Sequence, residues 1–192
     1  FGDMLKSFIP PTKGARDFWL AFVGRSLFIF AYYMILNYQL YVLEDYVGQS
    51  AQQAGNTIAV MSMVSMIVGL VSSLAGGPIS DRIGKRKIMI VLASVLMAVG
   101  FVLPWILHSP LSMILFAGFS GFGYGLYGAV DQALNVDVLP NKEEAGKDLG
   151  ILNIATTLGQ MVGPIVTTVV FPVAIGFAAF ASLFIMLIKS VR

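Results

Sequence analysis

The stretch Gly77-Pro-Ile-Ser-Asp81-Arg82-Ile-Gly84-Lys85-Arg86-Lys87 separates two long apolar segments of the chain, residues 56–75 and 88–107. Its eleven residues include four basic side chains and one acidic side chain. Because charged side chains are costly in the hydrocarbon of a bilayer, we expect a tight turn between two membrane-spanning helices. Gly77 and Gly84 would allow the close backbone approach and the tight turn that such a connector needs.

The overall composition also favours a membrane protein. Of the 192 residues, 57% are hydrophobic and only 11% are charged, whereas about a quarter of the residues in a soluble domain are charged. The sequence contains no Cys, no nucleotide-binding loop, no cluster of metal ligands and no nucleophile–base set. We therefore expect neither an enzyme nor a cofactor, a bound metal or a nucleic acid partner.

Apolar segments predict six membrane-spanning helices, each long enough to cross about 30 Å of hydrocarbon. They cover residues 18–42, 57–75, 88–107, 111–136, 149–171 and 173–188. We expect an all-α integral membrane protein in which residues 1–17 form a connector and residues 18–192 form one six-helix domain.

The basic side chains predict the orientation of these helices. If the six segments alternate in direction, eleven of the twelve basic residues fall on one side of the membrane, and the opposite connectors contain none. The eleven are Lys6, Lys13, Arg16, Arg82, Lys85, Arg86, Lys87, Lys142, Lys147, Lys189 and Arg192. Because basic residues concentrate in cytoplasmic connectors, we expect both termini in the cytoplasm and the chain in the cell membrane.

The stretch at residues 77–87 resembles the signature loop of the major facilitator superfamily, Gly-x-x-x-Asp-Arg-x-Gly-Arg-Lys/Arg. Its positions are occupied here by Gly77, Asp81, Arg82, Gly84, Lys85 and Arg86, with Lys85 in place of Arg. The resemblance implies a conformational latch, in which Asp81 and the basic residues hold one half of a transporter against the other. For Lys85, Arg86 and Lys87 the alternative is a role in topology and in contact with lipid headgroups, which we prefer for Lys87.

The resemblance covers essentially the whole chain and implies a C-terminal half. Phe8-Ile-Pro-Pro-Thr-Lys-Gly-Ala-Arg-Asp-Phe-Trp19 is similar to the connector that leads into the seventh helix of bacterial members. The connector from Asp137 to Gly150 is similar to the loop between helices ten and eleven, and its Asp-Leu-Gly-Ile-Leu-Asn run at 148–153 resembles actinobacterial members. Since the family has twelve helices in two halves, the implied partner is an N-terminal six-helix half.

The six segments differ in polarity in a way that predicts an internal repeat. The first and fourth are rich in polar residues, whereas the third and sixth have almost none beyond Ser94 and Ser182. The second carries a stripe of small residues suited to close packing, formed by Ser62, Gly69, Ser73 and Gly76. This order fits an inverted three-plus-three repeat, with the first and fourth helices lining a cavity and the third and sixth facing lipid.

Polar stripes on the first, fourth and fifth segments predict a water-filled path for a solute or a proton. At 100° per residue, the polar residues of the fourth segment share one helix face. Amide, phenol and carboxylate groups are costly to leave in lipid, so they must face a cavity or another helix. The predicted cavity residues are Arg25, Tyr33, Asn37, Tyr124, Tyr127, Asp131, Gln132, Asn135, Asn153 and Gln160.

Arg25 and Asp131 have matching depths, about 12 and 13 Å from the cytoplasmic ends of their helices. An isolated charge at this depth is costly, and a pair of opposite charges costs much less. One interpretation is a structural ion pair, or an Arg25 side chain that extends to the interface. The other is that Asp131 binds a proton or a cationic substrate while Arg25 adjusts its pKa.

Together with the resemblance, these features favour half of a secondary transporter that moves a small solute by alternating access. We expect proton-coupled symport of a polar, sugar-like nutrient. The alternatives are a drug exporter and a non-transporting six-span membrane regulator. The expected partners are the N-terminal half, the small-molecule solute and membrane lipid, and for the isolated half a second copy in a homodimer that covers the cavity face.

Overall fold

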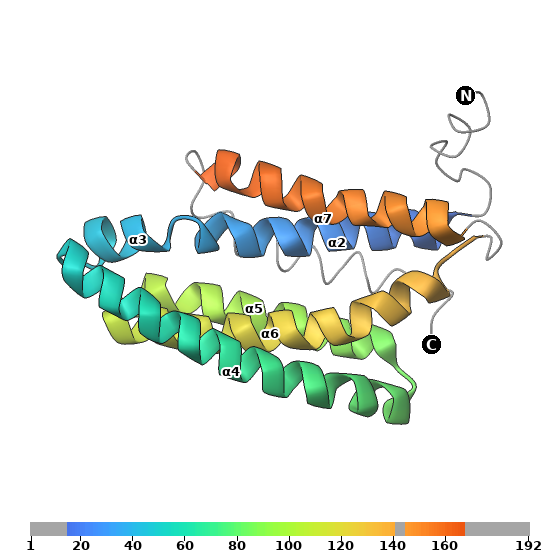
Figure 1. Cartoon of the computed structure of the whole chain (residues 1–192), viewed down its shortest axis with the longest axis horizontal. Coiled ribbons are helices and arrows are strands. Elements are labelled where there is room, and N and C mark those ends of the chain that lie inside the picture. The colour runs from blue at the N-terminus through green and yellow to red at the C-terminus, as the bar shows by residue number, and fades with distance from the viewer. Residues whose placement is uncertain (1–14, 141–144, 168–192) are drawn as a thin grey trace.

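The computed structural model describes residues 15–140 and 145–167, and within these ranges the chain forms helices and short connectors (Figure 1). Five helices are long and apolar enough to cross a membrane: α2, Arg16–Leu36; α4, Ala51–Ile83; α5, Arg86–Leu107; α6, Pro110–Asp137; and α7, Ala145–Thr167. The all-α architecture is thus confirmed for the described residues. The predicted sixth segment, residues 173–188, lies outside them, so a total of six helices stays a prediction.

The long helices form two groups. In one group α6 packs along both α4 and α5, and in the other α2 packs along α7 (Figure 1). Contacts between α6 and the α2–α7 pair are far fewer than the contacts inside either group. The boundary between the two groups is therefore where α2 and α7 meet α6, and it contains most of the polar residues described below.

Glycines bring the helices close together inside each group. A Cβ atom added to Gly125 of α6 would lie 2.3 Å from the carbonyl oxygen of Gly69 on α4. A Cβ atom added to Gly159 of α7 would lie 2.9 Å from the Ile29 side chain on α2. Neither helix pair leaves room for a side chain at these points. Such contacts are typical of membrane helices, which associate through close packing because lipid is as apolar as their surfaces.

The small-residue stripe of α4 differs in part from the prediction. Gly69 and Gly76 lie against α6 as expected, whereas Ser62 and Ser73 are exposed. Ser65 lies at the contact instead, and its hydroxyl donates a 2.9 Å hydrogen bond to the carbonyl oxygen of Ala117 on α6. The residues of α4 that face α6 are spaced three or four apart, as expected where two helices pack together. Ser62 and Ser73 lie outside this face.

The predicted turn at residues 77–87 is mostly helix, so that prediction was wrong in extent. Helix α4 continues through Pro78 to Ile83, and the chain reverses only at Gly84 and Lys85. Gly84 has a φ of 63°, the left-handed conformation that ends many helices and that glycine adopts at low cost. Gly77 lies inside α4 with open space around its Cα, so it serves neither a turn nor a close approach. With 33 residues α4 is longer than the roughly 20 that cross a bilayer, so its charged end can lie outside the hydrocarbon without a break in the helix.

The first predicted span, residues 18–42, is also interrupted. Helix α2 ends at Leu36, and a short helix α3, Gln39–Tyr41, and a π-helix η1, Val42–Tyr46, follow. The Asn37 amide nitrogen donates a 3.0 Å hydrogen bond to the carbonyl oxygen of Tyr33. Asparagine side chains compete in this way with the backbone N–H groups of a helix, which accounts for the break. Apolar content alone does not reveal it.

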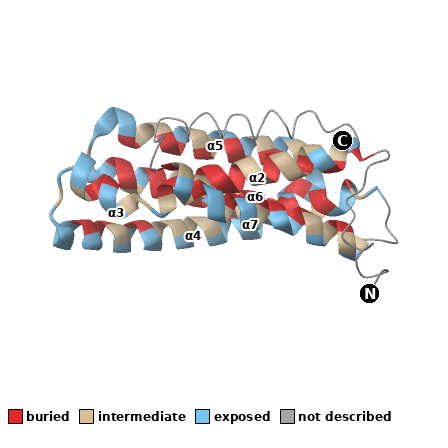
Figure 2. Cartoon of the chain, turned by 90° about the horizontal axis from the view of Figure 1, so that it is seen from above, coloured by how far each residue is buried: buried red, intermediate tan, exposed pale blue. Residues whose placement is uncertain are grey.

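The prediction that the third helix faces lipid holds for one of its faces. On α5, Leu92 and Val95 are exposed, while Ala93 and Met97 are buried against α6. Helix α4 buries a smaller share of its most apolar segment than any other long helix among the described residues. Figure 2 shows its exposed residues along the outer edge of the bundle. The widest exposed apolar surface described is therefore on α4.

Candidate functional site

An ion pair between Arg25 of α2 and Asp131 of α6 lies at the boundary between the two helix groups. The Nη1 atom of Arg25 is 2.8 Å from the Oδ2 atom of Asp131. Both residues are buried, with 7% and 4% of their surfaces exposed. The sequence placed the two at matching depth, and the structure brings them into direct contact. A buried pair of this kind is far cheaper than either charge alone.

The guanidinium group of Arg25 also contacts α7. Its Nε atom donates a 2.8 Å hydrogen bond to the Thr156 hydroxyl, and its Nη2 atom donates a 3.1 Å hydrogen bond to the Asn153 carbonyl oxygen. One side chain therefore connects three helices through three different nitrogen atoms. The planar fork of arginine suits this arrangement, because its N–H groups point in fixed directions.

The carboxylate of Asp131 has further neighbours on its own helix. Asn135, one turn along α6, donates a 3.0 Å hydrogen bond from Nδ2 to the Oδ2 atom of Asp131. The Tyr127 hydroxyl lies beside the same carboxylate from the preceding turn. The Oδ1 atom of Asn135 is buried and has no hydrogen-bond partner within the described part of the chain. The carboxylate is thus held by groups that leave one amide oxygen available nearby.

Aromatic rings border this polar cluster. The rings of Tyr32 on α2 and Tyr124 on α6 are stacked with centroids 4.4 Å apart, and those of Phe28 and Tyr127 are stacked at 3.8 Å. Both stacks join rings from the two helix groups, so they lie on the same boundary as the ion pair.

A second polar contact between α2 and α7 lies two turns further along α2. The Nε2 atom of Gln160 donates a 3.2 Å hydrogen bond to the hydroxyl of Tyr33. Nearer the end of α7, the Tyr38 hydroxyl donates a 3.0 Å hydrogen bond to the carbonyl oxygen of Pro164. Pro164 lies inside α7, three residues before its last described residue, Thr167.

Two predicted cavity residues lie apart from this cluster. Asn37 is exposed and bonds only to the backbone of α2 in the contacts described, and Gln132 is exposed on the side of α6 next to Asp131. Thr156, which contacts Arg25, was not among the predicted cavity residues. Thr156 and Thr157 follow Asn153 by three and four residues, so both lie close to the same helix face as Asn153. Periodicity alone does not separate such neighbours, and the structure exposes Thr157.

A separate ion-pair cluster joins the ends of α4, α5 and α6. Arg86, the first residue of α5, pairs with Asp137 at the end of α6 and lies 3.7 Å from Asp81 near the end of α4. It also donates a 3.4 Å hydrogen bond to the carbonyl oxygen of Ala133. Of the six predicted latch residues, Asp81 and Arg86 are in contact, and Gly77 lies apart in the helix. The latch function itself stays a prediction.

Comparison with known proteins gives the family. The sequence profile of the Major Facilitator Superfamily matches residues 18–190. The chain belongs to the major facilitator superfamily. Members of this superfamily are membrane transporters and not enzymes. With five helices that could cross a membrane among its described residues, this chain is a multi-pass membrane protein of that superfamily.

Two curated relatives of this superfamily chain are transporters. The "Na(+), Li(+), K(+)/H(+) antiporter" of Planococcus maritimus is 32% identical over 125 residues, and the "MFS transporter asaE" of Aspergillus flavus is 31% identical over 134 residues. These alignments cover 60% and 67% of this chain, but only 29% and 30% of the relatives. The chain therefore matches less than a third of the length of either protein.

Proposed function

We propose that this chain forms the C-terminal half of a secondary active transporter that moves a small solute by alternating access. Its six-helix domain would be residues 18–192, with both ends in the cytoplasm and with an N-terminal half as partner. The family membership and the short match to longer relatives support this proposal. The pairing of α4 with α6 and of α2 with α7 also suits an inverted repeat, in which these two contacts would be equivalent.

The observation that carries the coupling proposal is the buried pair of Arg25 and Asp131. A proton that binds Asp131 removes the charge that holds the Arg25 guanidinium against α6. The α2–α7 pair then loses this ionic connection to α6, so that protonation and helix movement become linked. In this scheme Asp131 carries the coupling proton, and Arg25 returns to it when the proton leaves.

The solute class we propose is a polar, sugar-like nutrient transported with protons. Tyr33, Gln160 and Asn153 offer hydroxyl and amide groups near the boundary of the two helix groups, and such groups suit a hydroxylated solute. The tyrosine stack of Tyr32 and Tyr124 offers an aromatic face for a sugar ring. The same aromatic surface would suit a drug-like solute, which makes export of drugs the alternative within this class.

A second candidate is exchange of alkali cations for protons. The relative from Planococcus maritimus is named as an antiporter of Na⁺, Li⁺ and K⁺ with H⁺. In this chain Asp131 lies next to the buried Oδ1 atom of Asn135, and oxygen atoms of this kind are the ligands that hard cations prefer. A cation there would compete with Arg25 for the carboxylate.

Transport by the full-length protein in liposomes tests these proposals. Uptake would be measured for sugars, cationic drugs and Na⁺, Li⁺ and K⁺, with and without a pH gradient. We expect Asp131→Asn to abolish gradient-driven transport, while Gln132→Ala, an exposed neighbour on the same helix, retains it. Gradient-driven transport that persists in Asp131→Asn would rule out a coupling role for this carboxylate. Failure of every solute with correctly folded protein would favour a non-transporting regulator.

A further inference from the structure

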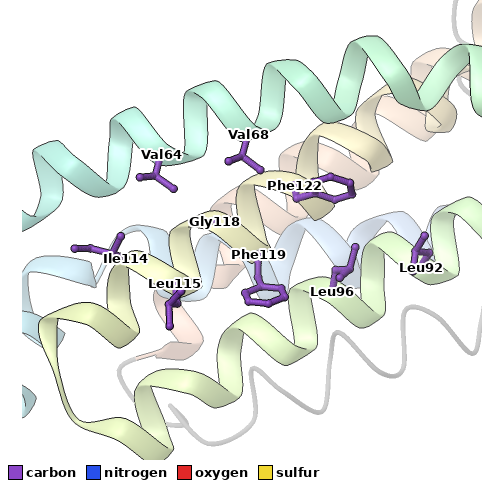
Figure 3. Close-up of a pocket in the computed structure, with 9 residues that line it drawn as sticks. All are labelled: Val64, Val68, Leu92, Leu96, Ile114, Leu115, Gly118, Phe119 and Phe122. Atoms are coloured by element: carbon purple, nitrogen blue, oxygen red, sulfur yellow. The ribbon is translucent and has the colours of Figure 1, made fainter.

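An apolar groove of about 490 Å³ lies on the outer side of the group formed by α4, α5 and α6 (Figure 3). Two valines of α4 and two leucines of α5 form its walls, and α6 forms its floor. The residues that line it are Val64, Val68, Leu92, Leu96, Ile114, Leu115, Gly118, Phe119 and Phe122. None of these side chains has a polar atom, so the groove cannot recognise a hydroxylated solute or an ion.

The groove exists because of how the three helices pack. Helices α4 and α5 both pack along α6 but make few contacts with each other, which leaves a channel between them. Gly118 deepens the channel floor: a Cβ atom there would contact only Val64, at 3.6 Å. Its lining runs along α6 from Ile114 to Phe122, and its apolar chemistry suits a hydrocarbon chain.

Both walls of the groove lead to a basic residue at the same end. Arg82 follows Val64 by 18 residues on α4, which is five helical turns and returns to the same face. Lys85 precedes Leu92 by seven residues, or two turns, and lies about 10 Å from it along α5. Arg82 and Lys85 are exposed. Neither forms an ion pair among the described residues, whereas the neighbouring Arg86 forms an ion pair with Asp137.

We propose that the groove binds one acyl chain of an anionic phospholipid whose phosphate lies at Arg82 and Lys85. One leaflet of hydrocarbon is about 15 Å deep. Along their helices Leu92 lies about 10 Å from Lys85 and Val68 about 21 Å from Arg82, so the end of a chain anchored at these side chains reaches the near end of the groove, beside Leu92. The negative headgroup complements the two positive side chains, and the hydrocarbon complements the lining. This site is independent of the coupling role proposed for Asp131, because it lies on α4, α5 and the outer face of α6.

The test compares two lipids that share their acyl chains and differ in charge. The 192-residue chain would be purified in mild detergent, and bound phosphatidylglycerol or phosphatidylcholine would be counted by native mass spectrometry. One basic side chain strengthens binding to an anionic lipid by about five-fold. We therefore expect a preference of about 30-fold at most for phosphatidylglycerol, and its loss in the double variant Arg82→Gln, Lys85→Gln. The single variant Arg16→Gln, at an exposed site on α2, should retain the preference.

The acyl-chain part of the proposal has its own pair of variants. Gly118→Leu fills the groove and should reduce binding of both lipids, whereas Gly128→Leu, in open space on the same helix, should bind both as the parent chain does. Circular dichroism would confirm that both variants are folded. Unchanged lipid binding in folded Gly118→Leu would overturn the proposal, as would equal binding of the two lipids by the parent chain.

Cross-linking tests whether residues 173–188 of the same chain occupy the groove in place of lipid. The chain has no Cys, so a Phe122→Cys variant can be paired with single cysteines placed in residues 173–188. Disulfide formation in the membrane at several of these positions would place that segment in the groove and overturn lipid binding there. Absence of cross-links, together with the two lipid results above, is the expected outcome.

Discussion

The Arg25 guanidinium and the Asp131 carboxylate, 2.8 Å apart, connect two groups of helices that otherwise share few contacts. Arg25 belongs to α2, which packs along α7, and Asp131 belongs to α6, which packs between α4 and α5. The pair is buried, so water does little to weaken it. This buried contact between the two groups therefore depends on the charge of a single carboxylate.

Removal of one partner of this pair should destabilise the protein. Arg25→Met leaves the buried carboxylate of Asp131 without its counter-charge, at an expected cost of about 3–5 kcal/mol in the free energy of unfolding. The double variant Arg25→Met, Asp131→Leu replaces both charges by apolar groups and should recover most of that loss. Thermal unfolding in detergent would measure both, and a double variant less stable than the single would contradict the account.

The Asp131→Asn variant should separate folding from coupling. The amide keeps the shape of the side chain and can still accept a hydrogen bond from Arg25, so we expect a folded protein. It cannot take up a proton, so transport by the full-length protein should no longer respond to a pH gradient. Solute counterflow, which needs no gradient, would show whether the solute still binds. A normal response to pH in this variant would leave Asp131 with a structural role only.

The hydrogen bond from Arg25 to Thr156 should contribute measurably to stability. Thr156→Val keeps the shape of the side chain and removes the hydroxyl that accepts the 2.8 Å hydrogen bond from Nε of Arg25. Because this hydrogen bond involves a charged group, we expect the free energy of unfolding to fall by about 1–3 kcal/mol. Thr157→Val is the matched control, since that side chain is exposed and should change stability by less than about 0.5 kcal/mol. Equal effects of the two substitutions would mean that Arg25 does not depend on Thr156.

Gly125 should not tolerate any side chain. A Cβ atom there would lie 2.3 Å from the backbone oxygen of Gly69, and backbone cannot move aside as a flexible side chain can. We expect Gly125→Ala to cost about 1–3 kcal/mol by forcing α4 and α6 apart. Gly128→Ala, in open space on the same helix, should be neutral or slightly stabilising, because alanine favours helix more than glycine does. Urea or thermal unfolding would compare the two.

The two ends of the bundle should differ in access from outside the cell. Tyr46 of η1 contacts His108 at the end of α5, so Gln49 and His108 lie at the same end. Lys85 lies at the other end of α5, about 33 Å away along the helix. With single cysteines in this Cys-free chain, an impermeant reagent added outside should label Gln49→Cys and His108→Cys but not Lys85→Cys. Labelling of Lys85→Cys alone would reverse the proposed orientation.

The sequence predicted the class of fold well, because long apolar segments and a charged connector leave few alternatives. It offered a contact of Arg25 and Asp131 as one of its interpretations, because both charges lie at one depth and neither is stable alone in hydrocarbon. It did not separate Thr156 from Thr157, since both lie near one helix face and the rotation of α7 depends on tertiary packing.

Helix ends were predicted less well for a physical reason. A run of charges was interpreted as a turn, but charge excludes a segment from hydrocarbon without breaking its helix, so α4 extends to Ile83. The opposite error occurred in the first span, where apolar residues continue although the helix ends at Leu36. There the hydrogen bond of the Asn37 side chain and the following π-helix interrupt the α-helical backbone, and neither feature changes the hydropathy of the segment.

The backbone contacts at Gly125 and Gly159 have a consequence for how solution conditions act on this protein. Contacts between backbones carry no group that titrates between pH 4 and 9, so these glycine contacts between α4 and α6 and between α2 and α7 do not themselves depend on pH. The Arg25–Asp131 contact, in contrast, depends on a carboxylate that a proton can neutralise. We therefore expect acid to weaken the boundary between the two helix groups, where the Arg25–Asp131 pair lies, while the glycine contacts inside each group stay unchanged.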